Sequence, residues 1–288
     1  MGRAENIIVF EDTVERCRDS QRLMESIRES CDSQVVVLES AEVPDGRRIA
    51  QEQPRFSQPA QLVLTKERTF QAAEKYVRNP LYQDKRICVL NFASSMNPGG
   101  GVVRGASAQE ESLCRCSTLY FCLDAVRDTF YLPHRNGLSF LHNDDVIYTP
   151  RVTVFKSDAA KPRPLAEKDW YQVDVISCAA PNLRSYFGHL LDDLGEMNPP
   201  AIEGAQLAAI HTQRLRRILD VAVQQEVDVL VLGAFGCGAF MNDPHVVAPV
   251  MVELAREYAS CFQTIEFAVY CSRWERENYH AFQQALES

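Results

Sequence analysis

The chain has 288 residues, 46% of them hydrophobic, which is enough to fill one large α/β domain or two small ones. Its formal net charge of −9 excludes a protein that binds long nucleic acid through a global basic field. No stretch approaches the roughly 18 consecutive apolar residues that a membrane-spanning helix requires.

Cysteine usage indicates a reducing compartment. The ten cysteines are scattered through apolar runs, without the dense, even spacing of a disulfide framework. Cys114 and Cys116 lack the two-residue spacer of a zinc knuckle, and the six histidines form no ligand cluster, so we expect no metal site and no cofactor. The amino terminus has only a four-residue apolar stretch, too short for a signal-peptide core. These features predict a cytoplasmic protein.

Residues 1–60 are predicted to form an accessory segment packed on the core. Residues 7–10, Ile-Ile-Val-Phe, have the composition of a short strand, and the segment from there to about residue 30 has helical spacing of its apolar positions. Residues 34–38 predict a second strand. The polar, turn-rich stretch 44–59 predicts a loop.

From residue 61 strands and helices alternate. Strands are expected at 61–64 and 86–92 with a helix at 67–77 between them, and a further helix from about residue 109. Two β-rich runs follow at 145–155 and 173–178, and then a helix at 203–226. The last third predicts strand 228–232, helix 244–258, strand 264–270 and a final helix. Continuous apolar strands favour a sheet covered on both faces, in a single domain spanning 1–288.

Two of these strands deliver a glycine-rich loop directly into the amino terminus of a helix. The first loop contains Gly99, Gly100 and Gly101, and the second runs from Gly233 to Phe240. Ligands bind at such positions in open α/β sheets, because the helix amino termini present unpaired N–H groups to anions. Neither loop has the spacing of a dinucleotide fingerprint or a Walker lysine. Both are expected to face one phosphate-bearing ligand.

A local basic cleft is an open alternative, although isolated basic residues usually mark solvated surfaces. The candidates are Lys161, Arg163, Arg214, Arg216 and Arg217.

Seven residues separate the glycine triplet from Gln109, Glu110 and Glu111 at a predicted helix start. Acidic residues at this position complement the helix dipole, so simple capping is a competing interpretation. The preceding ligand-type loop and the apolar residues that follow instead favour carboxylates aimed into a cleft.

These motifs resemble the bacterial-type poly(ADP-ribose) glycohydrolases, whose signature is a glycine triplet followed after six to eight residues by Gln-Glu-Glu. The stretches VLNFASSMNPGGG, QEESLCRCSTLY and GAFGCGAFMNDP are also similar to that family. The resemblance implies a macrodomain-like, three-layer α/β/α fold with a mixed central sheet. It also implies hydrolysis of ribose–ribose O-glycosidic bonds in poly(ADP-ribose), from chain ends, with ADP-ribose as product.

The resemblance implies roles for particular residues. Glu111 is expected to be the catalytic acid/base, with Glu110 as its ribose-binding neighbour. The other residues expected to bind ADP-ribose are Asn97, Gly99, Gly100, Gly101, Gln109, Gly236, Cys237, Gly238 and Phe240. Adjacent helical residues point about 100° apart, so the two glutamates are not expected to flank the scissile bond as a conventional carboxylate pair.

Other functions use the same motifs. A mono-ADP-ribosyl hydrolase acting on protein or on thymidine would need the same loops and the same acid. A non-catalytic ADP-ribose reader would need the loops but no proton donor. A nucleotide phosphatase would be expected to have metal-ligand clusters. The expected partners are poly(ADP-ribose) or ADP-ribosylated macromolecules, with no membrane and no extended nucleic-acid surface.

Overall fold

The computed structural model describes residues 1–137, 139–184, 200–271 and 276–288. Its strands form one seven-stranded mixed sheet in the order β1-β4-β5-β3-β6-β7-β2. The strands are β1 (Val35–Val37), β2 (Gln61–Thr65), β3 (Ile87–Phe92), β4 (Val146–Val154), β5 (Tyr171–Cys178), β6 (Val229–Leu232) and β7 (Thr264–Ala268). Strands β5, β3, β6, β7 and β2 run parallel, whereas β4 is antiparallel to both of its neighbours.

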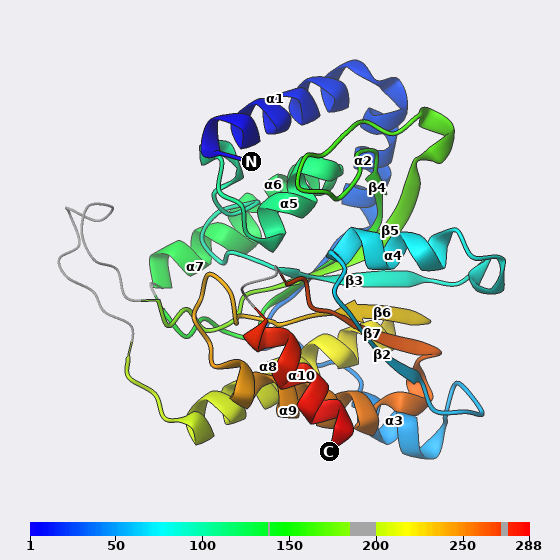
Figure 1. The fold of residues 1–288 in the computed structure, drawn as a ribbon, viewed down its shortest axis with the longest axis vertical. Coiled ribbons are helices and arrows are strands. Elements are labelled where there is room, and N and C mark those ends of the chain that lie inside the picture. The colour runs from blue at the N-terminus through cyan, green and yellow to red at the C-terminus, as the bar shows by residue number, and fades with distance from the viewer. Residues whose placement is uncertain (138, 185–199, 272–275) are drawn as a thin grey trace.

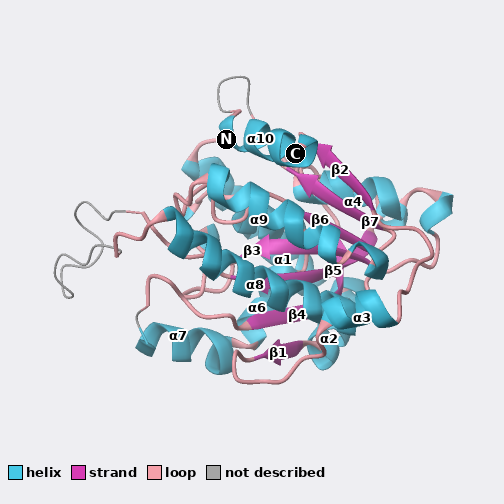
Figure 2. Ribbon diagram, turned by 90° about the horizontal axis from the view of Figure 1, so that it is seen from below, coloured by secondary structure: helices cyan, strands magenta, loops and turns pink. Residues whose placement is uncertain are grey.

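Helices cover both faces of this sheet (Figures 1 and 2). One face packs against α1 (Arg3–Asp19), α4 (Thr69–Val77), α5 (Gln109–Cys116) and α6 (Leu119–Ala125), with α2 (Gln21–Ser33) lying over β4. The other face packs against α3 (Gly46–Glu52), α8 (Gly204–Gln224), α9 (Pro244–Glu257) and α10 (Glu277–Glu287). The short helix α7 (Leu132–Gly137) precedes β4.

The central strands are apolar along their whole length because both faces are covered. Val89 of β3 belongs to the core on the α4–α5 side, and its neighbour Leu90 belongs to the core on the α8–α9 side. The predicted three-layer arrangement with a mixed sheet is confirmed. No helix in the described ranges combines the length and the apolar character needed to cross a membrane.

Parallel pairing determines where the site forms. Strands β3 and β6 are hydrogen-bonded neighbours, with Val89 opposite Val231. Their carboxyl ends therefore lie at the same edge of the sheet, and so do the ends of β5, β7 and β2. The loops after these strands meet there, which brings together segments that are about 130 residues apart in sequence.

Most predicted elements from residue 61 onward agree with the structure to within a few residues. The strand predicted at residues 7–10 is wrong, because these residues lie inside helix α1. The buried positions of α1 are Asn6, Phe10, Thr13 and Cys17, so a helical spacing of four and three residues overrides the β propensity of the Ile-Ile-Val-Phe run.

The stretch 44–59 is not entirely loop, because it contains helix α3. The Asp45 carboxylate caps that helix by accepting hydrogen bonds from the backbone N–H groups of Arg47 and Arg48. Residues 1–60 also contribute to the sheet and to the hydrophobic core. Strand β1 forms one edge of the sheet, and Ala50 of α3 belongs to the core.

Candidate active site

A cleft with a cavity volume of about 430 Å³ lies at the carboxyl edge of the parallel strands. Its walls come from the segments after β2, β3, β4, β5, β6 and β7, from the first turn of α5 and from the start of α10. Seven of the residues expected from the sequence line it: Gly100, Gln109, Glu110, Glu111, Gly236, Gly238 and Phe240. The topology thus brings both glycine loops and the Gln-Glu-Glu run to one place.

Glu111 has one carboxylate oxygen fixed and one without a partner. The side chain belongs to a residue only 7% exposed, and Oε1 accepts a hydrogen bond of 2.8 Å from the backbone N–H of Gly101. Oε2 is buried and has no hydrogen-bond partner among the described residues. A buried polar oxygen left unpartnered costs free energy unless a ligand satisfies it. The arrangement therefore presents a ready acceptor or donor to a ligand in the cleft.

Glu110 is held more completely. Its Oε2 accepts a hydrogen bond of 2.8 Å from the backbone N–H of Ser94, and its Oε1 lies 3.3 Å from the Asn91 amide nitrogen. Burial raises the pKa of Glu110 well above its usual value, and the nearby charge of Glu111 adds to the rise, while hydrogen bonds donated to its carboxylate oppose it. The Glu110 carboxyl group thus takes up a proton more readily than a solvated one.

The two carboxylates converge despite their divergence at the backbone. A Cβ atom built on Gly100 would lie 2.6 Å from Oε1 of Glu111 and 2.9 Å from Oε2 of Glu110. The two side chains leave the helix in directions about 100° apart, but both carboxylates end close to Gly100. Gly100 has φ of +60° and lies between the two acids, so the absence of a side chain here makes room for both.

Gln109 and Asn97 are engaged in contacts within the protein. The Gln109 side chain accepts a hydrogen bond from the backbone N–H of Phe92 and donates to the backbone oxygen of Leu90, which fixes α5 to the end of β3. Asn97 does not line the cleft, and its side-chain oxygen accepts a hydrogen bond of 2.7 Å from Arg135. Gly99 and Gly101 also lie outside the lining.

The second glycine loop, residues 233–240, contains backbone N–H groups that have no acceptor among the described residues. Gly236 has φ of +79°, a left-handed conformation that favours glycine. Within the described part of the chain, the backbone N–H groups of four cleft residues donate no hydrogen bond: Gly236, Gly238, Ala239 and Phe240. Unpaired amides that converge on a concave surface form an anion-binding nest. Cys237 does not line the cleft and packs against the hydrophobic core on the α8–α9 side of the sheet.

The cleft is also lined by residues that the sequence did not reveal. They are Glu67, Arg68, Asp158, Tyr270 and Asn278. The guanidinium carbon of Arg68 lies 4.3 Å from the centre of the Tyr270 ring, which is 54% exposed. Glu67 and Arg68 follow β2, and Tyr270 follows β7. Ligands bind in the loops after parallel strands, so these three residues could have been found by applying that expectation to every predicted strand.

The five basic residues considered for a cleft do not line this one. Arg214 is 2% exposed and forms an ion pair of 2.8 Å with Asp144. In the described ranges, no group of three His, Cys, Asp or Glu side chains is arranged to hold a metal ion.

This fold and cleft define a macrodomain-like α/β protein whose glycine loops enclose a pair of carboxylates. Residues 4–157 match the model of the microbial-type poly(ADP-ribose) glycohydrolase (PARG) catalytic domain. The chain belongs to this family.

Solved structures agree over almost the whole chain. The poly(ADP-ribose) glycohydrolase from Thermomonospora curvata shares 28% identity at a TM-score of 0.79, with 97% of this chain and 98% of that one covered. The enzyme from Deinococcus radiodurans, solved in complex with ADP-ribose, shares 32% identity at a TM-score of 0.72, with 91% of this chain and 97% of that one covered. No curated protein sequence matches this chain.

Proposed function

We propose that this protein is a poly(ADP-ribose) glycohydrolase that uses Glu111 as its acid/base. The observation that carries the proposal is the buried Oε2 of Glu111, which has no hydrogen-bond partner among the described residues and belongs to the cleft that both glycine loops line. A binding module would need that oxygen only as a hydrogen-bond acceptor, whereas hydrolysis needs a group that donates and recovers a proton. The family and the ADP-ribose complex of the Deinococcus enzyme support the choice of ligand.

In the proposed reaction Glu111 first acts as an acid. Its carboxylic proton passes to the leaving ribose oxygen while the bond to the anomeric carbon breaks, and the electron pair of that bond stays with the oxygen. The ring carbon develops oxocarbenium character. The Glu111 carboxylate then takes a proton from a water molecule as its oxygen bonds to the anomeric carbon, which regenerates the acid. The Gly101 N–H, 2.8 Å from Oε1, fixes the orientation of the carboxyl group throughout.

The remaining cleft residues fit the other parts of ADP-ribose. We assign the diphosphate to the free amides of the second glycine loop, where its negative charge also stabilises the oxocarbenium ion. Glu110 is positioned to bind a ribose hydroxyl beside the reacting carbon, and Phe240 to pack on the sugar. Elsewhere in the cleft lining, the Tyr270 ring and the Glu67 carboxylate suit an adenine base, which offers a π face and an amino group.

Glu111→Gln provides the test. Glutamine keeps the size and most polar contacts of the side chain, but it cannot donate and recover a proton. We expect ADP-ribose binding to stay within about threefold of wild type, while release of ADP-ribose from poly(ADP-ribose) falls by about 10²–10⁴-fold. Binding is measured by calorimetry and release by chromatography.

Digestions of three substrates by both proteins separate the alternative functions. The substrates are poly(ADP-ribose), mono-ADP-ribosylated protein and ADP-ribosylated thymidine DNA. Cleavage of either of the last two without the polymer would replace our substrate assignment. Binding of all three without cleavage would establish a reader, and wild-type turnover by Glu111→Gln would refute the role of Glu111.

We further propose that residues 1–288 act as one domain in a reducing, cytoplasmic environment. All ten cysteines are free thiols, which supports the compartment. The net charge of −9 supports a partner recognised through ADP-ribose units, with no extended nucleic-acid surface.

A further inference from the structure

Asn242 lies directly behind the second glycine loop. The residue is 2% exposed, and its side-chain nitrogen lies near three backbone oxygens, those of Pro181 at 2.7 Å, Phe240 at 3.1 Å and Gly236 at 3.2 Å. Two of these oxygens belong to the loop, and the third belongs to the segment after β5. A single amide therefore fixes the curvature of the loop and its distance from the neighbouring strand.

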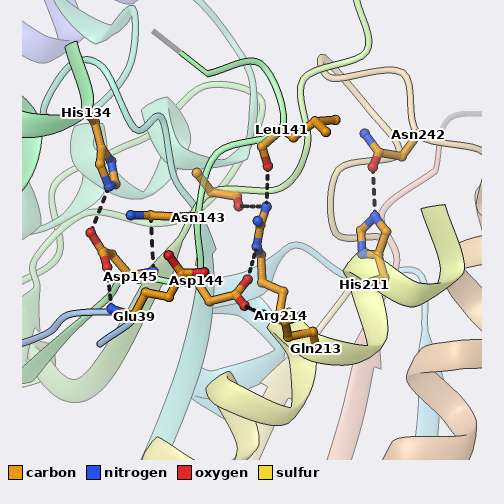
Figure 3. Close-up of polar contacts among 11 residues, drawn as sticks. Glu39, His134, Leu141, Asn143, Asp144, Asp145, His211, Gln213, Arg214 and Asn242 are labelled. Atoms are coloured by element: carbon orange, nitrogen blue, oxygen red, sulfur yellow. Dashed lines mark hydrogen bonds and ion pairs between the residues drawn. The ribbon is translucent and has the colours of Figure 1, made fainter. Parts of the chain in front are cut away.

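The orientation of this amide is determined by its surroundings. Three carbonyl oxygens on one side require the NH₂ group there, because the alternative orientation would place four oxygens together. Oδ1 of Asn242 must therefore point away from the loop, where it lies 2.7 Å from Nε2 of His211 on α8 (Figure 3). Since Oδ1 can only accept, His211 donates from Nε2.

His211 is a buried side chain with one hydrogen bond among the described residues. It is fully shielded from solvent, its Nδ1 has no hydrogen-bond partner in the described part of the chain, and its ring packs edge-on against Phe235 at 5.8 Å. The adjacent turn of α8 is held in place by Arg214, which binds Asp144 and the backbone oxygens of Leu141 and Ala179 (Figure 3). The helix thus provides a rigid support for the imidazole.

We propose that His211 and Asn242 are positioning residues that hold the second glycine loop in the shape that receives a diphosphate. The Nε2–H of His211 orients the Asn242 amide, which in turn holds the carbonyl groups of the loop on its core side. Gly236 and Phe240, whose carbonyl oxygens accept from this amide, also carry two of the four loop N–H groups that donate no hydrogen bond within the described part of the chain. This inference rests on the proposed function, because it assigns the anionic part of ADP-ribose to this loop.

The test compares His211→Phe, which keeps a ring but removes the donor, with His211→Gln, which keeps an N–H donor. Thr212→Val is the matched control on the same helix, because the Thr212 hydroxyl donates only to Ala208 within α8. We measure the Kd of ADP-ribose by calorimetry, kcat and KM on poly(ADP-ribose), and hydrogen–deuterium exchange of residues 234–242 without ligand.

For His211→Phe we expect a Kd raised about tenfold, equivalent to about 1.4 kcal/mol. KM should rise with it while kcat stays within about threefold, and exchange should accelerate in residues 234–242 but not in β6. His211→Gln should recover binding to within about threefold of wild type, and Thr212→Val should match wild type. A uniform structural defect would instead lower kcat and would not be rescued by the donor.

The proposal is overturned if His211→Phe binds ADP-ribose within twofold of wild type with unchanged loop exchange, or if His211→Gln binds as weakly as His211→Phe. If His211→Phe does not fold, Asn242→Ser replaces it, because a serine hydroxyl cannot reach all three carbonyl groups. If Asn242→Ser binds ADP-ribose as tightly as wild type, the proposal is also overturned. If wild-type protein binds no ADP-ribose, the proposed function fails, whereas the exchange measurement still tests the positioning role.

Discussion

Gly100→Ala separates catalysis from stability at the carboxylate pair. The added methyl group would lie 2.6 Å from Oε1 of Glu111, so that oxygen must retreat by about 0.8 Å to reach an ordinary contact of 3.4 Å. A displacement of about 1 Å at a reacting group typically costs about 10²-fold in rate. We therefore expect kcat to fall about 100-fold, which is about 2.7 kcal/mol of transition-state stabilisation.

The stability cost of the same change should be small. The clashing atoms are the ends of flexible side chains, so the main penalty is alanine at φ of +60°, about 1–2 kcal/mol, or a few degrees in Tm. Gly204→Ala is the control, because its methyl group would meet only Val246 at 3.6 Å. Calorimetry gives Tm, and a stopped digestion of poly(ADP-ribose) gives kcat. A folded Gly100→Ala protein with kcat within threefold of wild type would refute the reasoning.

Three further predictions concern stability. Burial raises the pKa of Glu110 in the folded state, so ionisation of this carboxyl group destabilises the fold as pH rises above about 4.5. Glu110→Gln should therefore raise Tm at pH 8, and the gain in Tm should shrink toward pH 4. An equal gain at both pH values would contradict this. Burial lowers the pKa of His211 from 6.5 to about 4, so the folded protein loses stability as pH falls below about 6.5. In urea titrations, the free energy of unfolding of His211→Gln relative to wild type should rise by about 2 kcal/mol from pH 7.5 to pH 5. The same difference at both pH values would contradict this prediction. Lys156 donates to the backbone oxygen of Val9, the Thr13 hydroxyl and the Asp12 carboxylate of α1 at 2.6–2.8 Å. Lys156→Met should therefore lower the free energy of unfolding by about 2 kcal/mol. A loss below about 0.5 kcal/mol would show that α1 packs on the core without these contacts.

The local sequence signals were accurate where one pattern dominated. The strand–loop–helix sequence around Gly99–Gly101 was predicted because a buried apolar run, a glycine cluster and a helix start follow one another within about 30 residues. The Ile-Ile-Val-Phe run misled because four apolar residues have the same appearance in a strand and in a helix, and only the burial of Phe10 and Cys17 on one side of α1 decides between them.

The sequence by itself determined the chemistry available to this protein: the Gln-Glu-Glu run, its spacing from three glycines, and a second glycine loop. Only the tertiary structure decided how these groups are used. Pairing of β3 with β6 places the two loops side by side, and Gly100 lets both carboxylates converge. The bond from His211 to Asn242 joins residues 31 positions apart. Such contacts depend on chain topology and packing, which local patterns do not encode.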